Sequence, residues 1–155
     1  MIAAIVALAV STPVPDTWLD AVQVIETGGH PNPDAAVGDG TRAKGRFQFH
    51  KEAWVDCTKV RKAAGLKTYP YSKATDPVVA REYAKTWLSY LMHRLTKEIG
   101  RPALAGETWL AWNLGFEGFR RHKFQMSLVP EAKYIKAAKI QAAIPIKLIP
   151  VCTTK

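Results

Sequence analysis

The sequence predicts a mainly α-helical, single-domain protein. The chain has 155 residues, a length that fits one domain with one sizeable core. Nearly half of the residues are hydrophobic and a tenth are aromatic, which excludes a chain disordered by composition. Apolar residues recur at helical spacing in several segments, and no pair of segments has the alternating pattern that predicts paired strands.

The first half of the chain predicts two helices separated by a polar loop. A helix is expected after Pro15, capped by Asp16 or Thr17, and it should end at the glycine pair 28–29. Residues 30–44 are rich in Pro, Gly, Asp and Asn and predict a loop. The next segment should begin as a short strand or turn and continue as a helix to about residue 65.

The second half predicts three further helices. Asp76 and Pro77 form a helix start with a cap and an early proline, and an apolar stripe then runs to Gly100. A shorter helix should end at Gly115, and a final helix should begin after Pro130. Residues 144–155 carry two prolines and no periodicity, so we expect an irregular tail after a domain spanning 16–143.

The N-terminal residues 1–15 leave two interpretations open. Their apolar start fits an atypical signal peptide or an ordinary N-terminal extension, and it is too short to span a membrane. Cys57 and Cys152 could form one disulfide, which would require an oxidising compartment.

The charge balance favours an anionic partner. Lysines and arginines number 22 against 13 acids, for a net charge of +9. Such a surface suits nucleic acid, an acidic membrane or an anionic cell-wall polymer, or it is simply a solvated basic face. No concentrated basic run or DNA-binding motif is present, so nucleic acid is not expected. The four histidines are scattered, and neither a metal nor another cofactor is predicted.

Glu26 is the first candidate catalytic residue. It follows Val22 by four residues and Trp18 by eight, so it should lie on or beside the buried face of its helix. Burial and the helix C-terminus both raise a carboxyl pKa, and a protonated glutamic acid suits general-acid catalysis. The alternative is a partly exposed glutamate at the border of the core.

Asp39 is the candidate for a second carboxylate. It lies between two glycines, where an aspartate commonly caps a turn. It could instead face Glu26 across a cleft and activate a water or stabilise an oxocarbenium-like transition state. Asp34 is a poorer candidate for that role.

Five further residues are candidates for substrate binding. Gln48 alternates with two phenylalanines, and Gly45 permits a close backbone approach. Trp112 and Asn113 end a helix, where plain capping is the alternative to a role in the site. Tyr134 could lie at the core edge or extend its hydroxyl into a cleft.

Five segments together resemble the soluble lytic transglycosylase and goose-type lysozyme group. These segments are "IETGGHPNP", "TRAKGRFQF", "DPVVAREYAKTWLSYLMHRL", "AWNLGFEG" and "EAKYIKAAKI", in the order of that group's motifs. The chain departs from the motifs at Thr27, Arg42, Trp112 and at Phe116-Glu117. The segment "GRFQFHKEAWVDC" also resembles invertebrate-type lysozymes, in which an aspartate shortly before this stretch is the second catalytic acid; Asp39 occupies roughly that place.

The resemblance implies a lysozyme-like domain with a substrate cleft, secreted or located in the periplasm or at the cell wall. It implies that Glu26 is the general acid, and that Gln48, Asn113 and Tyr134 line the site, with Tyr134 near Glu26. The expected activity is that of a monomeric muramidase, which cleaves peptidoglycan at the β-1,4 bond between N-acetylmuramic acid and N-acetylglucosamine. Lytic transglycosylation with Glu26 as the sole acid/base is the alternative, and a non-catalytic glycan-binding module is the alternative of another class.

Overall fold

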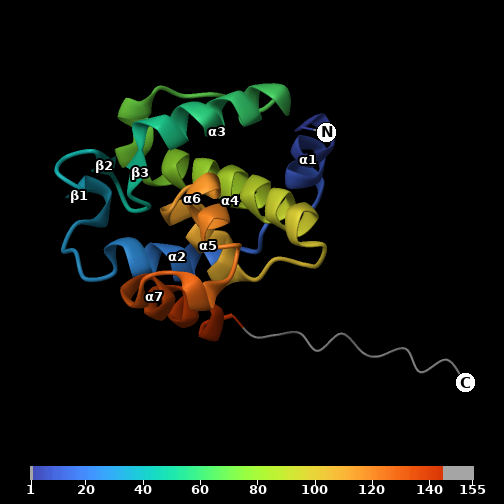
Figure 1. The fold of residues 1–155 in the computed structure, drawn as a ribbon. Coiled ribbons are helices and arrows are strands. Elements are labelled where there is room, and N and C mark those ends of the chain that lie inside the picture. The colour runs from blue at the N-terminus through green and yellow to red at the C-terminus, as the bar shows by residue number, and fades with distance from the viewer. Residues whose placement is uncertain (1, 145–155) are drawn as a thin grey trace, which may run out of the picture.

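The computed structural model describes residues 2–144 and is mainly helical (Figure 1). The α-helices are α1 Ile2–Ser11, α2 Asp16–Thr27, α3 Lys51–Ala63, α4 Pro77–Ile99, α5 Ala105–Asn113, α6 Phe116–Arg121 and α7 Glu131–Ala142. Short 3₁₀ turns occur at η1 Pro33–Ala35, η2 Tyr71–Thr75 and η3 Met126–Leu128. The strands are β1 Val37–Gly38, β2 Ala43–Lys44 and β3 Phe49–His50.

Helix α4 is the central element of the core. It packs against α1, α2, α3 and α5, and in Figure 1 α3 lies above it while α2 and α7 lie below. Its start is confirmed, because the Asp76 carboxylate accepts hydrogen bonds from the backbone N–H groups of Val78 and Val79, each at 3.1 Å. Its end is confirmed at Gly100, which has the left-handed conformation with φ 71°.

The prediction that the chain has no paired strands was wrong. The three strands form an antiparallel sheet in the order β1-β2-β3, with Val37 opposite Lys44 and Lys44 opposite Phe49. Each strand has only two residues, too few for an alternating pattern to be seen in the sequence. Asp39, Thr41 and Gln48 adopt positive φ, so the turns of this segment do not use glycine alone.

The N-terminal segment contains helix α1, which packs on α4 and α3. Ile5, Val6 and Ala9 are buried in the common core. Whether this segment is a signal peptide or an extension stays a prediction. Within residues 2–144, no helix combines the length and the apolar character needed to cross a membrane.

Helix α6 and Cys57 both contribute side chains to the buried core. Helix α6 was not predicted; its Phe116 and Phe119 are buried. Cys57 is buried, and its Sγ lies 3.4 Å from the carbonyl oxygen of Tyr83. Cys152 and the predicted irregular tail lie outside the described residues.

Candidate active site

A pocket of about 420 Å³ brings together five of the residues that the sequence singled out. They come from four parts of the chain: the end of α2, the loop after β1, the turn before β3 and the end of α5. The pocket is lined by Glu26, Asp39, Ala43, Gln48, His50, Trp112, Asn113 and Lys133. Glu26 and Asp39 therefore line one pocket, as the hypothesis of two acids requires.

Glu26 is held at the buried end of α2 by an indole. Trp109, which is fully buried on α5, donates a hydrogen bond from Nε1 to Oε1 of Glu26 at 2.8 Å. Burial raises the pKa of Glu26 above its ordinary value, and the Trp109 hydrogen bond and the charges of Lys136 and Lys133 oppose that rise. The predicted effect of burial on this carboxyl is confirmed. The result is a carboxyl that holds its proton more firmly than a solvated glutamate.

The residue after Glu26 ties the helix end to the sheet segment. Thr27 is buried, and its hydroxyl donates to the carbonyl oxygen of Arg46 at 2.8 Å. Arg46 in turn donates from Nη2 to Oδ2 of Asp34 at 2.8 Å, and this bond lowers the pKa of Asp34. Asp34 is occupied by that pair and does not line the pocket.

Gln48 lines the pocket, whereas Gly45 lies outside it and packs against η2. The Gln48 amide donates from Nε2 to the carbonyl oxygens of Gly45 at 2.9 Å and Ala36 at 3.3 Å. Gly45 does not line the pocket, so the structure does not place it against a substrate. It has φ 71°, and a Cβ there would overlap the carbonyl oxygen of Ala74. The close backbone approach expected at Gly45 is therefore an approach to the backbone of η2.

Asp39 is a half-exposed carboxylate in contact with an arginine and a histidine. Its Oδ1 lies 3.1 Å from Nη2 of Arg42, and its Oδ2 lies 3.4 Å from Nε2 of His50. The Asp39 side chain is 50% exposed, so solvent screens these contacts. Both oxygens are nonetheless oriented by neighbours at the edge of the pocket.

The end of α5 contributes the aromatic side chain of Trp112 and a polar atom of Asn113 that has no hydrogen-bond partner within residues 2–144. The rings of Trp112 and Phe49 lie 4.5 Å apart between centroids. The Oδ1 atom of Asn113 is buried and has no hydrogen-bond partner among the described residues. Buried polar atoms are usually satisfied, so this one calls for a ligand or water that donates to it.

Tyr134 is not brought into this pocket. Its side chain is 45% exposed, and the residue lines neither this pocket nor the adjoining ones. Successive residues on a helix point about 100° apart, so only one of two neighbours can face the same pocket. Helix α7 turns Lys133 toward Glu26 instead.

Three residues of the site were missed by sequence reasoning: Trp109, His50 and Lys133. Trp109 precedes Asn113 by four positions, so the face of α5 that carries Asn113 could have indicated it. His50 and Lys133 carry no comparable signal, because their approach to Glu26 depends on the packing of the sheet and α7.

Two further pockets adjoin the Glu26 pocket and extend it into a groove. One, of about 460 Å³, shares Glu26 and Gln48 and is lined also by residues 27–31 and 36–38. The other, of about 530 Å³, shares Gln48, His50, Trp112 and Asn113. It adds apolar and charged side chains from α3, α4 and α6: Trp87, Leu91, Phe116, Arg94, Arg121, Glu52, Asp56 and Glu117. We call these three pockets together the groove; Glu26 lines two of them.

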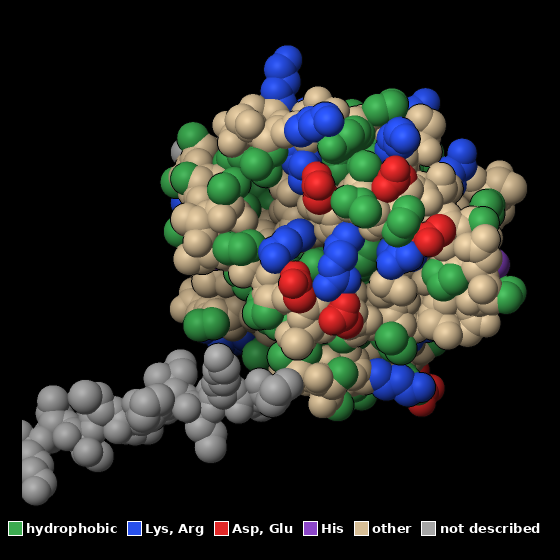
Figure 2. Space-filling view, turned by 180° about the vertical axis from the view of Figure 1, so that it is seen from behind, with side chains coloured by type: hydrophobic (Ala, Val, Ile, Leu, Met, Phe, Trp, Pro, Cys, Tyr) green, Lys and Arg blue, Asp and Glu red, His purple; other side chains and the backbone are tan. Residues whose placement is uncertain are grey.

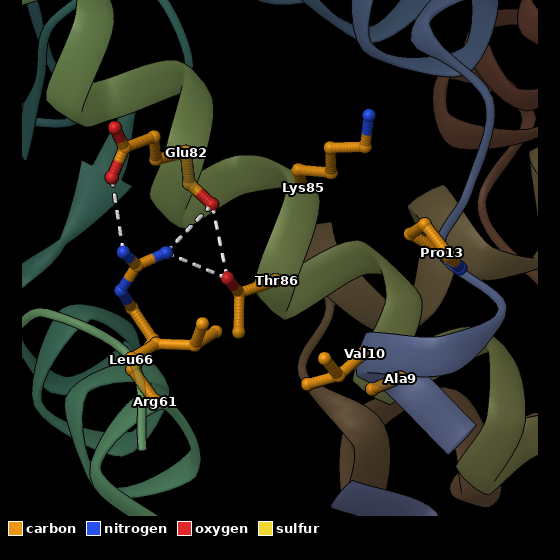
Figure 3. Close-up of a pocket in the computed structure, with 8 residues that line it drawn as sticks. All are labelled: Ala9, Val10, Pro13, Arg61, Leu66, Glu82, Lys85 and Thr86. Atoms are coloured by element: carbon orange, nitrogen blue, oxygen red, sulfur yellow. Dashed lines mark hydrogen bonds and ion pairs between the residues drawn. The ribbon is translucent and has the colours of Figure 1, made fainter. Parts of the chain in front are cut away.

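A separate pocket of about 300 Å³ lies between α1 and the facing parts of α3 and α4 (Figure 3). Its main polar group is Arg61, which is buried. Nη1 of Arg61 donates to Oγ1 of Thr86 at 2.8 Å, and Nη2 donates to Oε2 of Glu82 at 3.0 Å. Nε donates to the carbonyl oxygen of Lys67 at 2.8 Å. We assign this guanidinium a structural role because protein acceptors already satisfy it.

The surface charge shows no single basic patch on the face away from the viewer of Figure 1. Figure 2 shows lysines and arginines interspersed with acids there. Ion pairs such as Arg81 with Asp20 at 2.8 Å and Lys85 with Asp16 at 3.0 Å bring the opposite charges into contact.

No protein-family model, curated protein or solved structure gave a significant match to the chain.

Proposed function

We propose that this chain is a lysozyme-like muramidase, secreted or acting at the cell wall, and that the groove is its substrate cleft. The observation that carries the proposal is Glu26, a partly buried carboxyl with a raised pKa that lines two of the three pockets of the groove. A polymer needs binding sites on both sides of the bond that is cut, and pockets adjoin the Glu26 pocket through shared residues at both Glu26 and Asn113. The net charge of +9 favours an anionic wall polymer.

In the proposed reaction, Glu26 gives its proton to the glycosidic oxygen as the C1–O bond breaks. A water adds its oxygen to C1 and loses a proton, so the products are two shorter chains, one of them with a new reducing end. Asp39 is the residue that would take up the water proton or stabilise positive charge at C1. Its place in the same pocket as Glu26 favours hydrolysis over a mechanism with a single acid.

Lytic transglycosylation is the second candidate, because Trp109 positions Glu26 independently of Asp39. In that reaction Glu26 protonates the leaving oxygen as the C1–O bond breaks, and the 6-hydroxyl of the muramic acid then attacks C1 in place of water and gives its proton to the Glu26 carboxylate. The product then carries a 1,6-anhydro end, and Asp39 has no required role.

Purified peptidoglycan digested by the wild-type chain and by Glu26→Gln tests the proposal. General acid catalysis contributes about 10²–10⁴-fold, so the variant should lose at least about 100-fold in rate while its circular dichroism is unchanged. Glu131→Gln, which removes an exposed acid from the first turn of α7, is the matched control and should keep full activity. Normal wall clearing by Glu26→Gln would overturn the proposal.

Mass spectrometry of the fragments separates the two reactions. Reducing ends that are lost in Asp39→Asn indicate hydrolysis with two acids, whereas 1,6-anhydro ends that persist in Asp39→Asn indicate transglycosylation. Wild-type protein that binds the wall and releases no fragments would indicate a glycan-binding module.

A further inference from the structure

Lys133 is a cation in the Glu26 pocket that the proposed reaction does not use. It lies in the first turn of α7, is half-buried and lines the pocket directly. Within residues 2–144 its ammonium takes part in no ion pair, whereas the other acid of the pocket, Asp39, is in contact with Arg42 and His50. The pocket therefore contains one half-buried positive charge that no protein carboxylate neutralises by contact.

The positive charge of Lys133 disfavours the protonated form of Glu26. Its charge lowers the pKa of Glu26 and so opposes the effect of burial, which holds the proton on that carboxyl. A general acid gains nothing from such a neighbour. A charge in this place is useful to the reaction if it binds an anionic group of the substrate.

We propose that Lys133 determines specificity by binding a carboxylate carried by the muramic acid residue, so that the groove selects acidic glycan over neutral chitin. This inference rests on the proposed function, because it concerns a ligand of the same groove. An ammonium and a carboxylate form a charge-assisted hydrogen bond, which is stronger than a neutral one. Chitin is built of uncharged N-acetylglucosamine and offers no such partner.

The carboxylate has two chemical sources in peptidoglycan. On a muramic acid without a peptide it is the carboxylate of the lactyl ether. On a substituted muramic acid the lactyl group is an amide, and the nearest carboxylates belong to the stem peptide. Both present the same chemistry to Lys133, and the glycans used in the experiment separate them.

Lys136 provides a matched control for the charge of Lys133. It lies three residues further along the same helix and also lowers the pKa of Glu26. It is exposed and does not line the pocket. Lys133→Met and Lys136→Met therefore remove equal charge near Glu26, but only the first removes a charge from the pocket.

The experiment measures binding by calorimetry in the full chain carrying Glu26→Gln, so that neither cleavage nor the pKa of Glu26 affects the result. The ligands are three tetrasaccharides: a muramyl glycan with free lactyl groups, the same glycan with stem peptides, and chitotetraose. Lys133→Met should weaken binding of at least one muramyl glycan about 10- to 100-fold, the range expected for a hydrogen bond to a charged group. It should leave chitotetraose binding unchanged, and Lys136→Met should change every affinity by less than about twofold.

The outcomes distinguish failure of the inference from failure of the proposed function. The muramyl glycan that loses affinity identifies the source of the carboxylate. Equal loss for chitotetraose, or no loss for either muramyl glycan, would overturn the role of Lys133. If Lys133→Met shows the selective loss while the chain with an intact Glu26 cuts no glycan, the inference stands as glycan recognition and the muramidase proposal fails.

Discussion

The Arg61 pocket and the Glu26 pocket each contain an ionisable side chain that is at least partly buried. The two pockets differ in how many hydrogen bonds the protein makes to that side chain. Arg61 donates to Lys67, Thr86 and Glu82, and its guanidinium stacks 4.7 Å from the ring centroid of Tyr83. From the described part of the chain, the Glu26 side chain receives one hydrogen bond, donated by Trp109.

The two pockets differ in whether the protein itself satisfies the polar groups inside them. Around Arg61 the chain supplies the partners, so the site is complete without a ligand. Around Glu26 a buried oxygen of Asn113 has no protein donor, and Lys133 has no carboxylate in contact within the described residues. A pocket with several polar groups that lack hydrogen-bond or ion-pair partners is expected to bind a ligand, because the ligand can supply those partners.

The largest loss of stability is expected from Gly45→Ala, which tests the close contact between the turn before Gln48 and η2. The left-handed conformation costs a non-glycine residue about 1–2 kcal/mol. The new Cβ also overlaps the carbonyl oxygen of Ala74, and overpacking typically costs a further ~1–3 kcal/mol. Urea unfolding should show the combined loss. Gly40→Ala is the control, because Gly40 has φ 60° but open space around it, so it should lose only the conformational part.

Arg61→Met should reduce stability without affecting catalysis. Methionine keeps much of the aliphatic packing but removes the donors to Thr86 and Lys67. A buried acceptor left unsatisfied costs about 1–3 kcal/mol. Thermal unfolding should show that loss, while activity per folded molecule should equal that of the wild type. A selective loss of activity would show that the contrast between the two pockets is wrong.

The smallest effect, and opposite in sign, is expected for the stability of Glu26→Gln. Because burial raises the pKa of Glu26 in the folded state, the folded chain binds more protons than the unfolded chain above pH 4.5 or so, the ordinary glutamate value. The wild type therefore loses stability as pH rises from about 4.5 through the raised pKa. Glutamine has no such proton, so the variant should unfold at a higher temperature than the wild type at pH 7 but not at pH 4. Equal differences at both pH values would contradict the role of burial.

The helices could be predicted because their signals are local. The cap at Asp76, the left-handed Gly100 and the helix ending at Thr27 all depend on residues within a turn of each other. The place of Glu26 beside the buried face followed from the same periodicity. Five of the seven proposed site residues line one pocket, because the segments that carry them were correctly identified.

The sheet and the site partners could not be predicted, because they depend on contacts between distant segments. Strands of two residues pair only where the chain returns on itself, and Gln48 reaches the pocket through a positive φ. Trp109 meets Glu26 across 83 residues of sequence. The rotation of α7 that presents Lys133 to the pocket and leaves Tyr134 exposed is set by packing of its other face.

Spacing within single segments of the amino-acid sequence predicts helices α2, α3, α4, α5 and α7 and the position of one acid at the edge of a buried face, but not α1 or α6. The polar groups that surround that acid depend on how distant segments of the chain pack together. This packing placed Trp109 and Lys133 near Glu26 and left the Asn113 oxygen without a partner within residues 2–144. The reason is physical: burial, and with it the pKa of a carboxyl, depends on all the segments packed around the group.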